Sequence, residues 1–312
     1  MRPSLLVTLA ILLLLPFAMR NNFMMDVAVR VLLAAVAAVG LNLLMGFAGQ
    51  VSIGHAAFIA LGAYGSGIAT SRFGWPPVLA LVAAAAGASA VAWLIAKPIL
   101  RLKGHSLTMA TLGLGVIANI VLINEVAWTG GPDGMPVPPL QAGGLALTSV
   151  GQWYAVAAVV LYLAIAGSLN LYDSPAGRAL RGLNGSEVAA RVMGVDVASF
   201  KVRAFVLSAF LAAVSGSLTA HYLSFVSPSM ASFTHSVELA TMVVLGGMAS
   251  TYGAVLGAVV LTVLPQLLGG LQGYEMMLFG LILMLTMIFL PKGLVPSLED
   301  RLRRGVRGAD DA

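Results

Sequence analysis

Long apolar blocks, separated by short polar stretches, run along almost the whole chain. A transmembrane helix needs about 20 predominantly apolar residues, with about 17 as the lower limit, and most of the blocks reach that length. They lie at residues 4–19, 27–47, 56–70, 76–96, 106–128, 152–172, 204–226, 236–249, 252–268 and 276–290. The pattern predicts an all-α integral membrane protein, a polytopic bundle of about ten transmembrane helices.

Lys and Arg residues cluster between the blocks in a way that orients this bundle. Cytoplasmic loops of membrane proteins are enriched in these two residues. No Lys or Arg lies between Arg203 and Lys292, and both belong to basic clusters, so an even number of spans is expected between them. The same reasoning predicts that both termini are cytoplasmic. A signal peptide is the alternative for the first block, although residues 16–22 contain no small-x-small cleavage motif. The basic residues left on the outer side are Arg20, Arg30 and Arg72.

Composition narrows the class of protein further. Of the 312 residues 59% are hydrophobic and only 9% are charged, which excludes an ordinary soluble domain. The net charge of +5 is explained by cytoplasmic loops, so no nucleic-acid partner is expected. The sequence has no Cys, no phosphate-binding loop motif and no cluster with metal-ligand spacing. We therefore expect a conduit and not an enzyme, with no catalytic residue, metal or cofactor in this chain.

Residues 41–58, LNLLMGFAGQVSIGHAAF, combine an apolar background with polar side chains and glycines. Such residues are costly at membrane depth unless they face protein or a water-filled path. The stretch predicts a broken or re-entrant helix that lines the route of a solute, and a short cytoplasmic turn is the alternative. An acidic residue in a late apolar block is a further candidate for this route. The candidate path residues are Asn42, Gln50, Ser52, His55 and Glu238.

The polar stretch at residues 173–201 contains the signal of a short amphipathic helix. Pro175 ends the preceding span, Ser186 is a suitable N-cap, and Glu187 favours the first turn. Gly194 can end the helix. The apolar positions between them are Val188, Ala189, Val192 and Met193. A short helix with an apolar stripe persists in the cytosol only where another surface receives it, so we expect it to dock into a partner protein.

A second polar stretch, residues 129–151, begins with TGGPDGMPVPPL and carries no Lys or Arg. Its Gly and Pro content predicts an irregular outer loop. This loop either forms a docking surface or simply connects two spans.

Six stretches of the chain, in this order, resemble those of a known protein family. They are LNLLMGFAGQVSIGHAAFIALGAY from Leu41, LRLKGHSLTMATLG from Leu100, TGGPDG from Thr129, GRALRGLNGSEVAARVMGVDVASFKVRAFVLSAFLAAVSGSL from Gly177, VVLGGMASTYGAVLGA from Val243 and PKGL from Pro291. With these stretches the sequence resembles, over essentially its whole length, the LivM type of permease from branched-chain amino acid ATP-binding cassette (ABC) importers.

The resemblance implies one permease domain over residues 1–312, with an inner coupling loop at 173–201, an outer loop at 129–151 and a short basic cytoplasmic tail at 292–312. It also implies that the amphipathic helix is the coupling helix that fits a groove of an ATPase subunit. The residues that carry this role are Glu187, Ala189, Ala190, Met193 and Gly194.

The implied function is transport of branched-chain or related amino acids across the bacterial cytoplasmic membrane, driven by ATP and Mg bound on partner subunits. The implied partners are a second, LivH-type permease chain, two ATP-binding cassette subunits and an external solute-binding protein. The solute stays open between a branched-chain amino acid, another amino acid, urea or an amide, and an aromatic acid. The alternatives are an ion-coupled secondary transporter or channel, in which His55 or Glu238 relays protons, and a purely structural membrane subunit.

Overall fold

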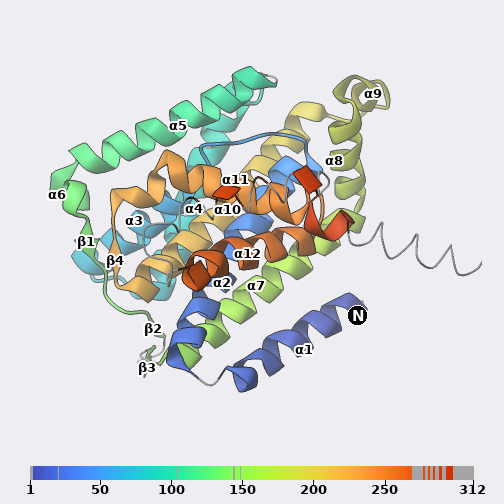
Figure 1. Ribbon diagram of the computed structural model, residues 1–312. Coiled ribbons are helices and arrows are strands. Elements are labelled where there is room, and N and C mark those ends of the chain that lie inside the picture. Colours follow the sequence, from blue (N-terminus) through green and yellow to red (C-terminus); the bar gives the residue numbers. More distant parts are fainter. Residues whose placement is uncertain are drawn as a thin grey trace, which may run out of the picture.

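The computed structural model describes residues 3–19, 21–102, 104–142, 145–147, 149–268 and 293–297, together with scattered positions between 277 and 289. Within these residues the chain forms a helical bundle with two very small sheets (Figure 1). The predicted span at 276–290 and the basic tail at 292–312 lie largely outside the described residues.

Every apolar block up to residue 268 coincides with a helix. The helices are α1 (Pro3–Ala18), α2 (Asn22–Asn42) continued by the π-helical turn η1 (Leu43–Phe47), α3 (Ala56–Phe73), α4 (Pro77–Ile99), α5 (His105–Asn124), α6 (Val126–Thr129), α7 (Val150–Asp173), α8 (Pro175–Gly185), α9 (Glu187–Val192), α10 (Val197–Leu223), α11 (Phe233–Gly246) and α12 (Thr251–Leu268). Five of the described helices are long and apolar enough to cross a membrane, and α1, α11 and α12 contain shorter apolar segments. These helices agree with an all-α membrane protein.

Helix α2 lies at the centre of the bundle. In its most apolar segment 83% of the residues are buried inside the protein, against 22% for α4 and for α5. It packs against α7, α10 and α12 (Figure 1). Small residues permit this close approach, since in lipid the association of helices depends on tight packing. At Gly40, for example, a Cβ atom would lie 2.8 Å from the Cβ of Leu211 on α10.

The predicted outer loop packs against the bundle. Strand β1 (Met135–Pro136) pairs antiparallel with β4 (Phe225–Val226), which follows α10. Strands β2 (Gln141–Ala142) and β3 (Leu145–Ala146) form a second pair, and the short 3-10 helices η2 (Gly131–Asp133) and η3 (Pro228–Ala231) flank the first. Val137 is buried and lies against Gly67 of α3. The loop is therefore tied to α3 and α10 and is more than a bare connection.

At the other end of the bundle the chain forms two short helices, α8 and α9, which project from it (Figure 1). We call residues 175–194 the hook. Its second helix, α9, is the predicted one. The first, α8, is not expected from the sequence: Ser174 accepts a hydrogen bond from the Gly177 N–H, and Pro175 occupies the first turn, so a residue that ends one helix also starts the next.

Candidate functional site

The predicted break between α2 and α3 is present at residues 43–55. Helix α2 ends in the π-helical turn η1, residues 48–55 are not helical, and α3 starts at Ala56. Four of the candidate path residues belong to α2's last position or to this break, and all four are buried. The exposed fractions are 0% for Asn42, 6% for Gln50, 1% for Ser52 and 0% for His55.

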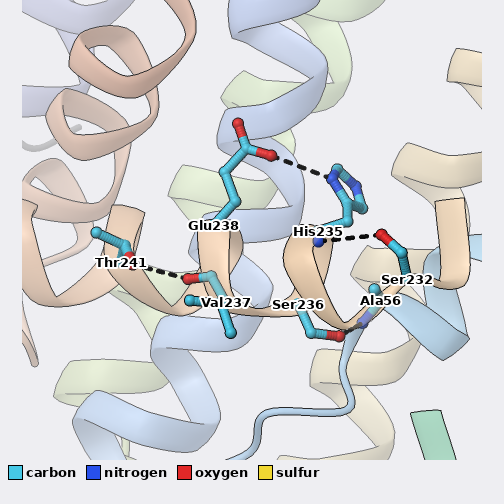
Figure 2. A network of polar contacts seen from close by, with 7 residues as sticks. All are labelled: Ala56, Ser232, His235, Ser236, Val237, Glu238 and Thr241. Carbon is cyan, nitrogen blue, oxygen red and sulfur yellow. Dashed lines mark hydrogen bonds and ion pairs between the residues drawn. The ribbon is translucent and has the colours of Figure 1, made fainter. Parts of the chain in front are cut away.

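Three other helices supply hydroxyl groups to the break. His55 Nε2 and Ser208 Oγ of α10 share a hydrogen bond of 2.9 Å. The Ile53 N–H donates to Thr111 Oγ1 of α5 at 3.2 Å, and the Ala56 N–H donates to Ser236 Oγ of α11 at 3.2 Å. Figure 2 shows this last contact, with Ser236 directed at Ala56. Non-helical backbone buried inside a protein needs such partners, because its polar groups are cut off from water.

The start of the break is held at both sides. Asn42 Oδ1 accepts a hydrogen bond of 3.0 Å from the Ala249 N–H, in the connection between α11 and α12. Asn184 Nδ2, on α8 of the hook, donates to the Gly46 carbonyl oxygen at 2.6 Å. A Cβ atom at Gly46 would lie 2.3 Å from the Ala249 nitrogen, so only glycine permits this approach. The hook, the break and the α11–α12 connection thus meet at one place.

Some buried polar side-chain atoms of this described stretch form no hydrogen bond in the structure. Among the described residues, the buried atoms Asn42 Nδ2, Ser52 Oγ and His55 Nδ1 have no hydrogen-bond partner in the structure. Buried polar groups are normally paired, and each exception calls for a water or a ligand. Gln50 uses its Nε2 to donate to the Ala48 carbonyl oxygen at 3.1 Å. The arrangement can therefore offer donors and acceptors to a small polar solute.

Glu238 lies apart from this cluster. It stands on α11 with 39% of its side chain exposed, and its Oε2 is 3.4 Å from His235 Nδ1. Figure 2 shows Glu238 and Ser236 directed to opposite sides of α11, so the contact with Ala56 and the carboxylate are on different faces. The other four candidate path residues belong to the end of α2 and to the break, whereas Glu238 lies on α11.

The hook presents an apolar surface to its surroundings. Ser186 caps α9 by accepting a hydrogen bond from the Ala189 N–H, and Gly194 follows the helix with φ +82°, as the sequence predicts. The exposed apolar side chains are Val188 at 68%, Val192 at 82% and Met193 at 82%. Ala189 is exposed as well, whereas Ala190 is only 6% exposed and faces the protein. Ala190 therefore packs against the protein behind α9.

An ion pair fastens the hook to the bundle. Lys201 on α10 is 3% exposed, and its Nζ pairs with Glu187 Oε1 at the start of α9. The resemblance counts Glu187 among five coupling residues, and in the structure its carboxylate pairs with Lys201 and so holds α9 against α10.

Sequence reasoning misses the residues that complete the site: Thr111, Asn184, Ser208 and Ser236. Each is a single polar residue whose partner lies far away along the chain. The available signal is a hydroxyl within or at the edge of an apolar block for Thr111, Ser208 and Ser236, and Asn184 is one amide in the polar stretch 173–201. In the part of the chain that the structure describes, no group of three His, Cys, Asp or Glu residues could hold a metal ion.

Comparison with known proteins gives consistent matches. The model of a family described as the permease component of branched-chain amino acid transport systems matches residues 23–290. The high-affinity branched-chain amino acid transport system permease protein LivM of Salmonella typhimurium is 33% identical over 89% of this chain and 71% of its own length. LivM of Escherichia coli is 32% identical with the same coverage. LivH of Escherichia coli is 27% identical over 85% of this chain and 92% of its own length. No solved structure matches.

Proposed function

Because the chain belongs to the family of permease components of branched-chain amino acid transport systems, we propose that it is the membrane-spanning permease subunit of an ABC importer for branched-chain or related amino acids. Its partners are a second, LivH-type permease chain, two ATP-binding cassette subunits and an external solute-binding protein. ATP and Mg bind on the ATPase subunits, since this sequence has no phosphate-binding loop.

The proposed membrane topology has ten spans in one permease domain, with residues 276–290 as the tenth. Both termini and the hook face the cytoplasm, and the break is re-entrant. Two features support this topology. The hook lies between α7 and α10 in the most basic loop of the described chain, and the backbone N–H groups of Ile53 and Ala56 at the break donate to side chains on α5 and α11.

The hydrogen bond between Asn184 and Gly46 carries the mechanism that we propose. It joins the hook, which has an apolar surface ready for an ATPase groove, to the break, which has unpaired polar atoms ready for a solute. Closure of the ATPase dimer on ATP moves the docked α9 and α8, and the motion reaches the break through Asn184. Docking and ATP shift the equilibrium between inward-open and outward-open states only as far as they bind one state more tightly than the other.

The solute path runs beside Asn42, Gln50, Ser52 and His55. Apolar neighbours such as Phe58, which lies 5.4 Å from the His55 ring between centroids, suit a branched aliphatic side chain. The polar groups suit its ammonium and carboxylate. Glu238 stays outside this proposed path.

Reconstitution tests the proposed function. The chain is placed in proteoliposomes with its LivH-type partner and both ATPase subunits, and uptake of labelled leucine is measured with the binding protein outside and ATP inside. We expect accumulation only when all components and ATP are present. Sustained accumulation by this chain alone, collapsing with the proton gradient, would instead favour an ion-coupled transporter.

A further inference from the structure

A groove of about 960 Å³ lies between α4 and α10, at the end of the bundle that carries the hook. On α4 the lining residues Ser89, Trp93 and Lys97 are spaced four positions apart. On α10 the lining residues Val202, Val206 and Phe210 have the same spacing. A spacing of four places residues above one another on one helix face. The two walls therefore form one continuous trough along the bundle.

The trough is basic at one end only. Lys97, Arg101 and Arg203 line it near the end of α4 and the start of α10, and Asp196 is the one acidic lining residue. Asp196 Oδ1 already accepts a hydrogen bond of 3.2 Å from the Ser199 N–H as the cap of α10. Three cations against one carboxylate leave a net charge of about +2 at this end.

The three cations have no carboxylate partner among the ion pairs of the described residues. Lys97 Nζ lies 5.6 Å from the ring centre of Trp93, and the Arg203 guanidinium carbon lies 5.4 Å from that of Phe200. Lys201, two positions from Arg203, behaves differently, since it is buried and paired with Glu187 of the hook. The groove cations thus remain available for an anion from outside the chain.

Apart from Ser89 and Ser199, the rest of the trough is apolar, and several of its side chains are exposed. Trp93 is 56% exposed, Leu207 38% and Phe210 40%. Exposed apolar side chains on membrane-spanning helices contact lipid tails, while Lys and Arg at the cytoplasmic boundary contact headgroup phosphates. The groove volume is at the upper end of the roughly 300–1,000 Å³ typical of small-molecule sites. The groove therefore has room for a ligand larger than a phosphate group.

We propose that this groove binds an anionic phospholipid of the cytoplasmic leaflet. Its phosphate lies among Lys97, Arg101 and Arg203, and one acyl chain follows Leu207 and Phe210. The assignment to that leaflet rests on the proposed function, which places the hook in the cytoplasm. A protein partner is a poorer occupant of the groove than an anionic lipid, because it would bury three cations without partners, which is costly.

Trp93 provides a direct probe, because it lines the groove while Trp75, Trp128 and Trp153 belong to the opposite end of the bundle. The full chain is placed in nanodiscs that contain either phosphatidylglycerol or phosphatidylcholine, each brominated on the upper part of its acyl chains. Subtracting the fluorescence of Trp93→Phe isolates the quenching of Trp93. We expect stronger quenching by the anionic lipid at equal mole fraction.

Charge-matched double variants identify the cations. Arg101→Gln/Arg203→Gln should weaken the apparent affinity for phosphatidylglycerol about 25-fold, at about five-fold for each cation near a membrane surface. Arg178→Gln/Arg191→Gln removes the same charge from the hook and should retain the wild-type affinity. Equal quenching by both lipids, or equal losses in both double variants, would overturn the proposal.

Two further experiments distinguish a bound lipid from other occupants of the groove. If millimolar glycerol phosphate abolishes the preference for phosphatidylglycerol, the groove recognises a free phosphate and not a lipid. If adding the LivH-type chain removes the quenching of Trp93 by lipid, the groove is an interface between subunits. The assay contains no nucleotide and measures no uptake, so its result and that of the reconstitution experiment can fail separately.

Discussion

The break at residues 43–55 and the hook at residues 175–194 depart from the ordinary distribution of side chains in opposite directions. The break buries polar groups such as Ser52 and His55 inside an apolar bundle, and the hook exposes Val192 and Met193. Each arrangement is costly when left alone. At the break, hydroxyls of three neighbouring helices pair with His55 and with the backbone N–H groups of Ile53 and Ala56, whereas none of the described residues covers the exposed side chains of α9.

This difference predicts that substitutions in the break mainly affect stability, whereas substitutions on the exposed face of the hook mainly affect transport. A change that disturbs the break strains contacts inside the chain and should lower its stability. A change on the exposed face of the hook leaves the isolated chain intact and should act only when the partner ATPase is present. Variants in the two regions should therefore have opposite signatures in a stability assay and in an uptake assay.

The largest effect is expected for Gly54→Ala. The new Cβ atom would lie 1.7 Å from the carbonyl oxygen of Thr111, a backbone atom that cannot move aside without shifting α5. We expect a destabilisation of about 4 kcal/mol or more, so that little folded protein is recovered. Recovery and thermal stability in detergent are read by fluorescence-detected size-exclusion chromatography.

Gly113→Ala is the matched control. Gly113 lies on α5, the helix that carries Thr111, and a Cβ atom there meets nothing within 4 Å. This substitution should be neutral or stabilising by up to about 1 kcal/mol. If Gly54→Ala is as stable as Gly113→Ala, the close approach between the break and α5 does not exist.

Val192→Asp should have the next largest effect, and only on transport. Val192 is 82% exposed, so the carboxylate is tolerated by the free chain but would be buried against the ATPase. The lost apolar burial and the buried charge together cost about 3 kcal/mol, which corresponds to a reduction of ATP-driven uptake on the order of 100-fold. Proteoliposome uptake and the melting temperature of the isolated chain are measured together.

Arg178→Ala serves as the control for this variant, because Arg178 is also exposed on the hook but lies on α8, away from the apolar stripe. A melting temperature that drops with Val192→Asp, or uptake that stays normal, would contradict the docking role of α9.

A smaller effect is expected for Lys201→Met, which removes the cation that holds Glu187 and thereby α9. Breaking a buried ion pair by removing one partner is destabilising, although Glu187 is 23% exposed and so the cost is moderated. We expect the hook to loosen and uptake to fall about ten-fold, on the basis of roughly 1.4 kcal/mol. Glu187→Gln/Lys201→Met removes both charges and should restore part of the uptake. No recovery in the double variant would mean that the ion pair does not position α9.

Local sequence signals predict much of both regions. The apolar blocks predict the helices up to residue 268, and Ser186 and Gly194 predict the start and end of α9, because capping depends on residues within one turn. The break is likewise predicted from polar residues and glycines close together in the chain. The prediction fails for α8, since Pro175 ends one helix and begins another, and the sequence alone does not distinguish the two uses.

The residues that complete the site depend on distant contacts. Ser208, Thr111 and Ser236 are ordinary hydroxyls in apolar blocks until the fold brings them to the break. The inward orientation of Ala190 depends equally on the packing of α9 against the bundle. The pairing of β1 with β4 has the same character, because it joins segments separated in the chain by four helices, α7 to α10. Periodicity alone contains no information about such partners.

The smallest predicted effect is the coupling between His55 and Ser208, which share a buried hydrogen bond of 2.9 Å. A double-mutant cycle of His55→Leu, Ser208→Ala and the combined variant should give about 1 kcal/mol of interaction energy in thermal unfolding, as for other hydrogen bonds in membrane proteins. Transport then sharpens the comparison between the two regions. His55→Leu/Gln50→Leu should change the kinetics of uptake in the reconstituted complex, because both side chains line the proposed path, whereas Ser208→Ala should act mainly through stability. Unchanged kinetics in the first of these variants, with folding intact, would reduce the break to a connection between two helices and leave the solute path elsewhere.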